Sequence, residues 1–248
     1  LIPALHFLMI SQLIAGLAAL TVLPVIATPH GLARRAAIDH DKVVGFPETV
    51  PSGTVGDVYL AYQPRLHVVN GCVPFPAVDA DGNTGAGLKP TGKQSGDCSE
   101  STGQIYVRGA PSGDYYALMY SWYWPKDESS DGLGHRHDWE GVIIWLADST
   151  STDASNIVAV CPSAHGNWKC STDDYTLDGT APLIKYQSSW PFNHALGLTK
   201  TVGGTQPLIA WESMSSVVQN ALETTDFGSG HVPFKEDSFA SNLGEATF

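Results

Sequence analysis

The chain has 248 residues, of which 43% are hydrophobic and 15% charged, so it can bury a sizeable core and lacks the composition of a disordered protein. With 13 basic and 25 acidic residues the formal net charge is −12, and no basic run provides the electrostatic footprint of a nucleic-acid-binding protein. The 25 glycines, 16 prolines and 10% aromatic residues favour strands and turns and argue against a coiled coil.

The N-terminal residues 1–27 carry no Asp, Glu, Lys or Arg, so they are long and apolar enough for either a membrane anchor or a secretory signal. Pro24 interrupts the apolar run late, and the run ends on a small residue. Both features favour a cleaved signal peptide, with a membrane anchor as the alternative. Arg34-Arg35 is a candidate site for further processing, so we expect residues 36–248 to form the mature, secreted, extracellular protein.

Four cysteines fall into two locally spaced pairs, Cys72/Cys98 and Cys161/Cys170. Neither pair has the CxxC spacing of a zinc knuckle or a thioredoxin-type redox motif. Two disulfides are therefore expected, in keeping with export to an oxidising compartment. Sequence alone allows three pairings, and the proximity of the partners along the chain favours 72–98 and 161–170.

The sequence predicts short elements separated by loops in the first part of the chain. We expect a short helix at the start of residues 36–46 and strands over residues 66–69 and 105–108. Residues 73–97 are dense in Gly, Pro, Asp and Lys, which is typical of a long loop.

The run YYALMYSWYW, residues 115–124, is apolar at nearly every position, as in a strand buried on both faces. Pro125 is expected to end it. Residues 141–146 and 157–160 repeat this pattern, whereas residues 209–224 space their apolar side chains at helical intervals. No internal repeat or long linker divides the chain. The sequence therefore predicts a mainly β fold, a single-domain β-sandwich with peripheral helices.

The heptapeptide GHRHDWE, residues 134–140, contains five ionisable side chains between two strongly apolar strands. Asp138 and Glu140 fall on one face of a strand, where neighbouring carboxylates repel each other unless a positive charge lies between them. A divalent cation meets that requirement, and carboxylate oxygens suit Ca²⁺, Mg²⁺ or Mn²⁺.

Neighbouring residues allow two interpretations of this cluster. In the first, Asp127 folds back as a third oxygen ligand, and His135 and His137 coordinate the cation or hold its water molecules. In the second, the charges form a solvated loop in which Arg136 pairs with an acid. The density of charge between buried strands favours the first interpretation.

The sequence contains no HExxH, no GxSxG and no phosphate-cradling glycine loop. His135-x-His137, with Glu140 and the distant His194, is similar to the metal site of jelly-roll metalloenzymes, although the gap between His137 and Glu140 is short for that pattern. A secreted metalloenzyme acting on cell-wall glycans therefore stays as an alternative, and we expect a protein that is not an enzyme.

These residues resemble a known family, the necrosis- and ethylene-inducing peptide 1-like proteins, which are secreted cytotoxins of plant-associated fungi, oomycetes and bacteria. The family heptapeptide stands intact at residues 134–140. LMYSWYWPKD at 118–127 and GLGHR at 132–136 are similar to the segment that plant immune receptors recognise. Residues 65–83 and 227–239 are also similar to family blocks, so the resemblance covers most of the chain.

The resemblance implies a β-sandwich similar to those of actinoporins and some fungal lectins, built from residues 36–248. It also implies a divalent cation in an acidic cavity, with calcium or magnesium expected and manganese possible in chemical terms. The matching ligand positions are Asp127, His135, Asp138, Glu140 and His194. The Cys72/Cys98 pair is similar to the single disulfide of the family's type 1 branch.

The implied target is the sugar headgroup of plant glycosylinositol phosphorylceramide sphingolipids, in the outer leaflet of the plasma membrane, and the implied outcome is membrane damage in eudicots. Trp190 matches a loop aromatic residue that enters the bilayer surface, and His137 and Arg136 are assigned with it to sugar and membrane contact. A plant immune receptor for residues 118–136 is a second expected partner. Because the net charge of −12 opposes adsorption to an anionic membrane, binding is expected to depend on specific headgroup recognition.

Three alternatives accompany this interpretation. Some family members keep the heptapeptide and are not toxic, so the chain is alternatively a non-lytic, lectin-like or immune-eliciting member. Trp190 is alternatively an ordinary core residue, and His194 a structural histidine.

Overall fold

The computed structural model describes residues 35–189 and 192–248. The signal peptide predicted over residues 1–27 lies outside the described residues, and so does Trp190. Within the described ranges, no helix is both long and apolar enough to cross a membrane.

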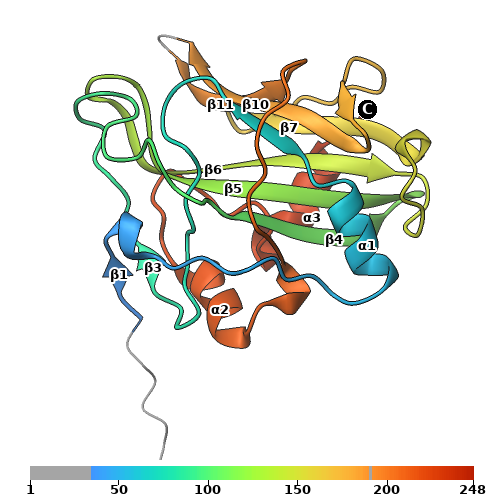
Figure 1. Cartoon of the computed structure of the whole chain (residues 1–248), viewed down its shortest axis with the longest axis horizontal. Helices are drawn as coiled ribbons and strands as arrows, with labels where there is room; N and C mark the ends of the chain where they lie inside the picture. Colours follow the sequence, from blue (N-terminus) through green and yellow to red (C-terminus); the bar gives the residue numbers. More distant parts are fainter. Residues whose placement is uncertain (1–34, 190–191) are drawn as a thin grey trace, which may run out of the picture. The chain divides into compact units, whose positions relative to one another are not determined.

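Within the described residues, the larger sheet has six strands in the order β12-β4-β5-β6-β7-β8. Figure 1 labels its strands β4, β5, β6 and β7. Its centre is one long hairpin made by β5 and β6. All neighbouring pairs are antiparallel except β12 and β4, which are parallel. The strands are β4 (Ile105–Ser112), β5 (Tyr115–Ser130), β6 (Leu133–Leu146), β7 (Ile157–Ala164), β8 (Asn167–Trp168) and β12 (Leu208–Ala210).

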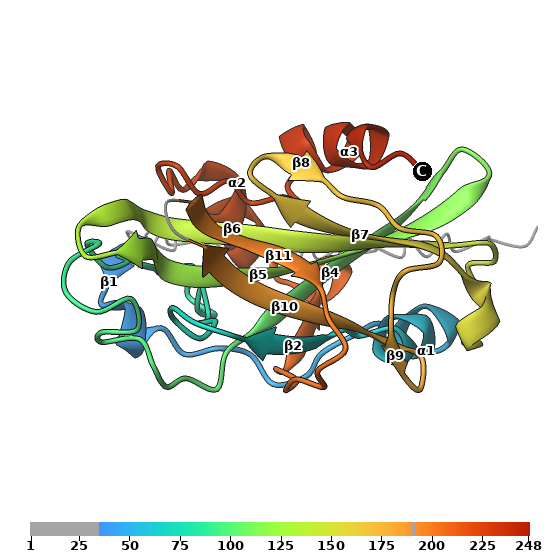
Figure 2. The same ribbon diagram turned by 90° about the horizontal axis from the view of Figure 1, so that it is seen from above.

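A smaller sheet packs against one face of this hairpin, so the two sheets form a sandwich. Its order is β11-β10-β2, with β9 paired to the start of β10, and β11 lies against β5, β6 and β7 (Figure 2). The strands are β2 (Arg65–Val68), β9 (Leu177–Asp178), β10 (Ala181–Ser189) and β11 (Phe192–Leu198). A separate short parallel pair joins β1 (Ala37–Ile38) to β3 (Thr84–Gly85).

The described residues form three peripheral α-helices: α1 (Thr54–Ala61), α2 (Ser216–Thr224) and α3 (Glu236–Glu245). Short 3₁₀ turns cover His40–Lys42, Ala154–Asn156 and Trp211–Ser213. Helix α2 begins after Ser215, whose side chain accepts a hydrogen bond from the Val218 N–H, as an N-cap residue does. Figure 2 shows α2 and α3 on the side of the larger sheet opposite β10 and β11.

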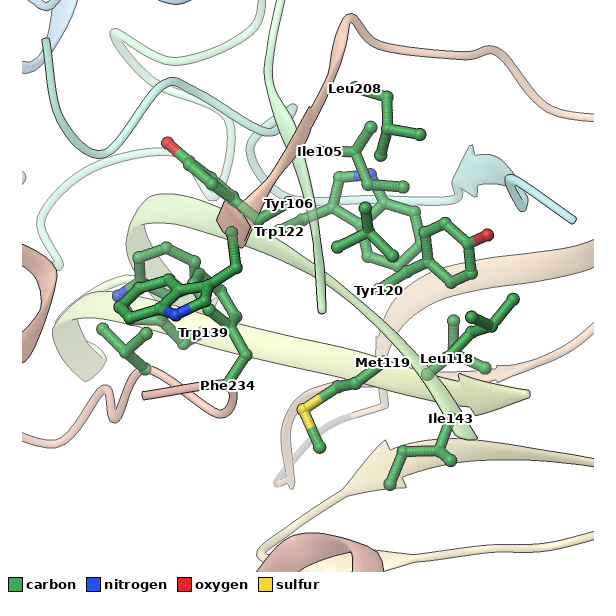
Figure 3. Close-up of a cluster of buried hydrophobic side chains, with 14 of the residues drawn as sticks. Ile105, Tyr106, Leu118, Met119, Tyr120, Trp122, Trp139, Ile143, Leu208 and Phe234 are labelled. Atoms are coloured by element: carbon green, nitrogen blue, oxygen red, sulfur yellow. The ribbon is translucent and has the colours of Figure 1, made fainter. Parts of the chain in front are cut away.

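From Ala117 to Trp124 the apolar run of β5 is buried, as predicted, whereas Tyr115 at its start is exposed. Towards α2 and α3, Tyr106 stacks on Phe234 with ring centroids 5.6 Å apart, and Trp139 meets Phe234 edge-on at 5.7 Å (Figure 3). Towards the smaller sheet, Trp124 stacks on Tyr186 of β10 at 3.9 Å. The hairpin is therefore the middle layer of the molecule, with a core on each side.

The structure pairs Cys72 with Cys98 and Cys161 with Cys170, the pairing that local spacing favoured. The first bond closes the long loop over residues 73–97. The second closes the β7–β8 hairpin.

Three sequence-based expectations about local structure were wrong. Pro125 does not end its strand: β5 continues to Ser130, and the Pro125 carbonyl accepts a hydrogen bond from the Leu88 N–H at 2.7 Å. A proline is tolerated there because the β5–β6 ladder, paired on both sides of it, forms no pair at Pro125 itself. Residues 36–46 form β1 and a 3₁₀ turn, and Ile209 lies in β12, so the helix expected from 209 begins only at Ser216.

Candidate functional site

The candidate site forms on the β5–β6 hairpin, where Asp127 lies directly opposite His135 in the register and Trp124 opposite Asp138. Strict alternation would place His135 and Asp138 on opposite faces, since they are three residues apart. His137 lies between them and has a left-handed backbone, with φ +59°. This conformation interrupts the alternation, so the two side chains reach the same side of the hairpin.

One position of the heptapeptide requires glycine because two strands come very close together there. Gly134 has φ +145°, and a Cβ atom there would lie 2.0 Å from the Asp127 carbonyl oxygen. Only glycine allows β6 to pass so near the backbone of Asp127, which brings His135 alongside that carboxylate.

Asp127, His135 and Asp138 each offer a ligand atom, and these atoms all lie within 4.8 Å of one another. His135 Nε2 lies 3.7 Å from Asp127 Oδ2, and His135 Nδ1 lies 2.8 Å from the carbonyl oxygen of His137. If Nδ1 donates to that carbonyl, Nε2 keeps a lone pair directed towards the carboxylates. Two hard carboxylates with one imidazole are a donor set that fits Ca²⁺, Mg²⁺ or Mn²⁺.

The two remaining predicted ligands, His194 and Glu140, lie beside this group. His194 is buried, and its Nδ1 lies 2.6 Å from Asp127 Oδ1 while its backbone N–H donates to the same carboxylate. Its Nε2 faces Gly71, where a Cβ atom would lie 2.4 Å away. Glu140 accepts a hydrogen bond from the Ser163 hydroxyl. His194 thus orients Asp127, and Glu140 lies beyond the three-residue group.

Burial and mutual repulsion make these carboxyl groups costly to ionise. Burial, followed by the charge of Asp127, raises the pKa of Asp138 to about 7, although Tyr186 donates to Asp138 Oδ2 at 2.8 Å. Burial, followed by the charge of Asp138, raises the pKa of Glu140 well above its usual value. A divalent cation would relieve the same repulsion, so the electrostatics agree with the donor set.

The group opens into a cavity of about 460 Å³. All five residues predicted as ligands line it. The sequence analysis assigned no site role to the other walls, which come from the β7–β8 hairpin and from the C-terminal segment that includes α3. These wall residues are Ser163, His165, Gly166, Asn167, Trp168, Ser229, His231, Val232, Pro233, Asp237, Ser238, Ser241 and Asn242.

Two residues predicted to contact sugar or membrane are engaged elsewhere. The Arg136 guanidinium donates to the carbonyl oxygens of Ala86 and Gly87, and His137 Nδ1 lies 2.6 Å from the Tyr123 hydroxyl oxygen. Neither residue lines the cavity. Both instead fix the hairpin to the neighbouring loop and core.

The sequence of the chain matches a known protein family and its members. The family model for necrosis inducing protein (NPP1) matches residues 56–246. NLP effector protein Pc576423 of Phytophthora capsici is 46% identical over 221 residues, which cover 87% of this chain and 93% of that relative.

Solved structures share the fold over most of the chain. One, described as a toxin fold for microbial attack and plant defence, is 46% identical with a TM-score of 0.81 and covers 86% of this chain and 100% of its own. The protein NLPPya in complex with mannosamine gives the same identity and TM-score, covering 86% and 99%. A protein described as non-toxic HaNLP3 is 35% identical with a TM-score of 0.80, covering 84% and 98%.

Proposed function

Because this chain belongs to the family of necrosis-inducing proteins, we propose that it is a secreted cytotoxin that binds the sugar headgroup of plant glycosylinositol phosphorylceramide sphingolipids and damages eudicot plasma membranes. The toxins of this family are not enzymes. The cation group of Asp127, His135 and Asp138, at the base of an open cavity, is the observation that carries this proposal.

The chemistry of the cavity supports recognition of a sugar. A bound Ca²⁺ or Mg²⁺ would supply open coordination positions for sugar hydroxyls, which are hard oxygen donors. The chain itself supplies further polar groups around the cavity, including Asn193, Ser238 and Asn242. NLPPya, a relative with 46% identity, has been solved with mannosamine, so its fold accepts an amino sugar.

An exposed aromatic residue at the start of β11 supports the proposal that the protein contacts a membrane. Phe192, at the start of β11, is 62% exposed although it is a large apolar residue. An exposed aromatic ring settles at the headgroup level of a bilayer, and we assign Trp190 to the same role. We place the action of the protein at the outer leaflet of the host plasma membrane, after secretion.

A vesicle sedimentation assay tests this proposal. The protein is mixed with vesicles that contain plant glycosylinositol phosphorylceramide, with added Ca²⁺ or Mg²⁺ and then with chelator. We expect sedimentation with the cation and loss of it with chelator or in Asp127→Ala. Asp114→Asn, an exposed change at the β4–β5 turn, is the matched control and should bind as the wild type does. Equal binding with and without cation would exclude the cation-dependent mechanism.

A second candidate function is a non-lytic member that binds the headgroup or triggers immunity. The observation that favours it is the similarity to non-toxic HaNLP3, which has the same fold. Vesicles that bind the protein and stay intact would support this candidate.

We also propose that a plant immune receptor recognises residues 118–136. The side chains from Leu118 to Trp124 are buried in β5, so a receptor reaches them only after the segment leaves the folded protein. A synthetic peptide of residues 118–136 should therefore elicit signalling without membrane leakage, and a peptide that elicits no response would contradict this assignment.

A further inference from the structure

The β7–β8 hairpin forms one wall of the cavity, and the cation group of Asp127, His135 and Asp138 gives this wall no role. Ala164 pairs with Asn167, and the two residues between them, His165 and Gly166, have φ values of +53° and +76°. Two successive left-handed residues make a tight type I′ turn, which fixes the direction of both strands. The Cys161–Cys170 disulfide closes the base of this hairpin.

The register of the hairpin directs Trp168 towards the site. Trp168 lies opposite Ser163, so their side chains share one face, and the Ser163 hydroxyl on that face donates to Glu140. The Ser163 Oγ also accepts the Gly141 N–H at 2.8 Å. The Cη2 atom of the Trp168 ring approaches Gly141, where a Cβ atom would lie 3.2 Å from it. The glycine after the heptapeptide thus leaves room for the indole.

Trp168 is only partly buried and lines the cavity, and the turn residue His165 is exposed beside it. The His165 ring lies 6.0 Å from the ring of Phe192, which is itself exposed on β11. Trp168 and His165 therefore line the cavity, and Phe192 lies next to His165. Figure 2 shows β8 next to α3, which contributes Ser238 and Ser241 to the facing wall.

We propose that Trp168, with His165 at the rim, is a stacking platform for the apolar C–H face of a hexose whose hydroxyls point to the acidic base of the cavity. This inference rests on the proposed headgroup recognition and adds the residues that select a flat pyranose ring. A pyranose ring has polar hydroxyl edges and an apolar face, and a pocket with an aromatic wall and convergent polar groups matches both. The Cys161–Cys170 disulfide closes the base of the hairpin that carries Trp168 and His165.

The test uses free glucosamine as the probe and the whole mature protein. The glucosamine affinity is measured with saturating Ca²⁺, and the Ca²⁺ affinity is measured separately without sugar. Trp168→Leu should weaken glucosamine binding by about three- to tenfold, the range expected for loss of one aromatic contact, with Ca²⁺ affinity unchanged. Trp168→Phe should recover most of the sugar affinity, and Tyr115→Leu, which removes an exposed aromatic ring that does not line the cavity, should change neither.

Two further readouts keep the test independent of folding defects. His165→Asn removes the exposed ring but suits a left-handed turn, and it should weaken sugar binding more mildly than Trp168→Leu. Saturation of the aromatic protein protons should transfer to glucosamine C–H protons in the wild type and decrease in Trp168→Leu.

Each outcome separates this inference from the proposed function. If the wild type binds Ca²⁺ and glucosamine but Trp168→Leu and His165→Asn bind the sugar equally well, the platform is excluded and the headgroup proposal stands. If Trp168→Leu loses Ca²⁺ and sugar affinity by the same factor, Trp168 is structural only and the platform is excluded. If the wild type binds neither Ca²⁺ nor Mg²⁺, the proposed function fails, and the platform fails with it.

Discussion

His137 occupies a left-handed conformation inside β6, at φ +59°, and the side chains of His135 and Asp138 therefore reach the same side of the hairpin. A β-branched residue at such an angle is strongly disfavoured, whereas asparagine adopts it readily. We expect His137→Val to lower Ca²⁺ affinity at least tenfold, because regular alternation would separate His135 from Asp138. His137→Asn removes the same imidazole and should cost much less. Calorimetric titration of both variants checks this, and equal losses would mean that the imidazole, not the backbone, matters.

The buried carboxyl groups give the cation-free protein a defined pH dependence. The pKa of Asp138 is about 7 in the folded state and near 3.8 in the unfolded state, and the pKa of Glu140 is also raised. The folded state then binds more protons between these values, so its stability falls as the pH rises from about 4 to about 7. The contribution of Asp138 is at most about 4 kcal/mol.

Thermal unfolding in chelator should therefore give a higher Tm at pH 5 than at pH 7, and Asp138→Asn should reduce the difference. Added Ca²⁺ should raise the Tm more at pH 7 than at pH 5, because protons compete with the cation for the same oxygens. A Tm that rises from pH 5 to pH 7 in chelator, in both proteins alike, would refute the assignment.

At the level of single residues, the sequence predicted the acidic cluster but not the residues that donate hydrogen bonds to its carboxylates. Asp138 and Glu140 are recognisable from the heptapeptide alone. Tyr186 and Ser163 have no local signature. Ser163 reaches Glu140 because β7 pairs with β6, and Tyr186 reaches Asp138 because the smaller sheet packs on the hairpin. The left-handed angle of His137 is equally invisible, since a period-2 pattern assumes regular strand geometry.

The β7–β8 hairpin is a short element whose base is closed by the Cys161–Cys170 disulfide. Replacing both cysteines with serine should lower the free energy of unfolding by about 2–3 kcal/mol, as expected for a small closed loop. It should also weaken glucosamine binding while Ca²⁺ affinity changes little, because the cation group lies on β5 and β6. Denaturant unfolding and the two titrations check this, and an equal loss of both affinities would contradict the division of roles.

The elements themselves were predictable where apolar runs are continuous, as over residues 115–124, 141–146 and 157–160. Their extent was not, because the strands continue through polar residues that the fold buries. Lys126 and Glu128 show why: both are buried, and Lys126 Nζ lies 2.6 Å from Glu128 Oε2. A paired charge in a strand looks like a loop in the sequence, although its desolvation is offset by the pairing.

The whole molecule carries a net charge of −12, which repels anionic lipid surfaces. We therefore expect no sedimentation with vesicles of phosphatidylserine and phosphatidylcholine at low salt, with or without glucosamine. Addition of the plant sphingolipid should create binding despite its own negative charge. Strong binding to phosphatidylserine vesicles alone would show that bulk adsorption, not headgroup recognition, controls membrane contact.

Dye release from vesicles that contain plant glycosylinositol phosphorylceramide tests the central claim most directly. The account predicts leakage with the mature protein in Ca²⁺ or Mg²⁺, and none with chelator or with Asp138→Asn, while Asp114→Asn leaks like the wild type. Leakage that persists in chelator, or in Asp138→Asn, would contradict a toxin that acts through the cation group of Asp127, His135 and Asp138.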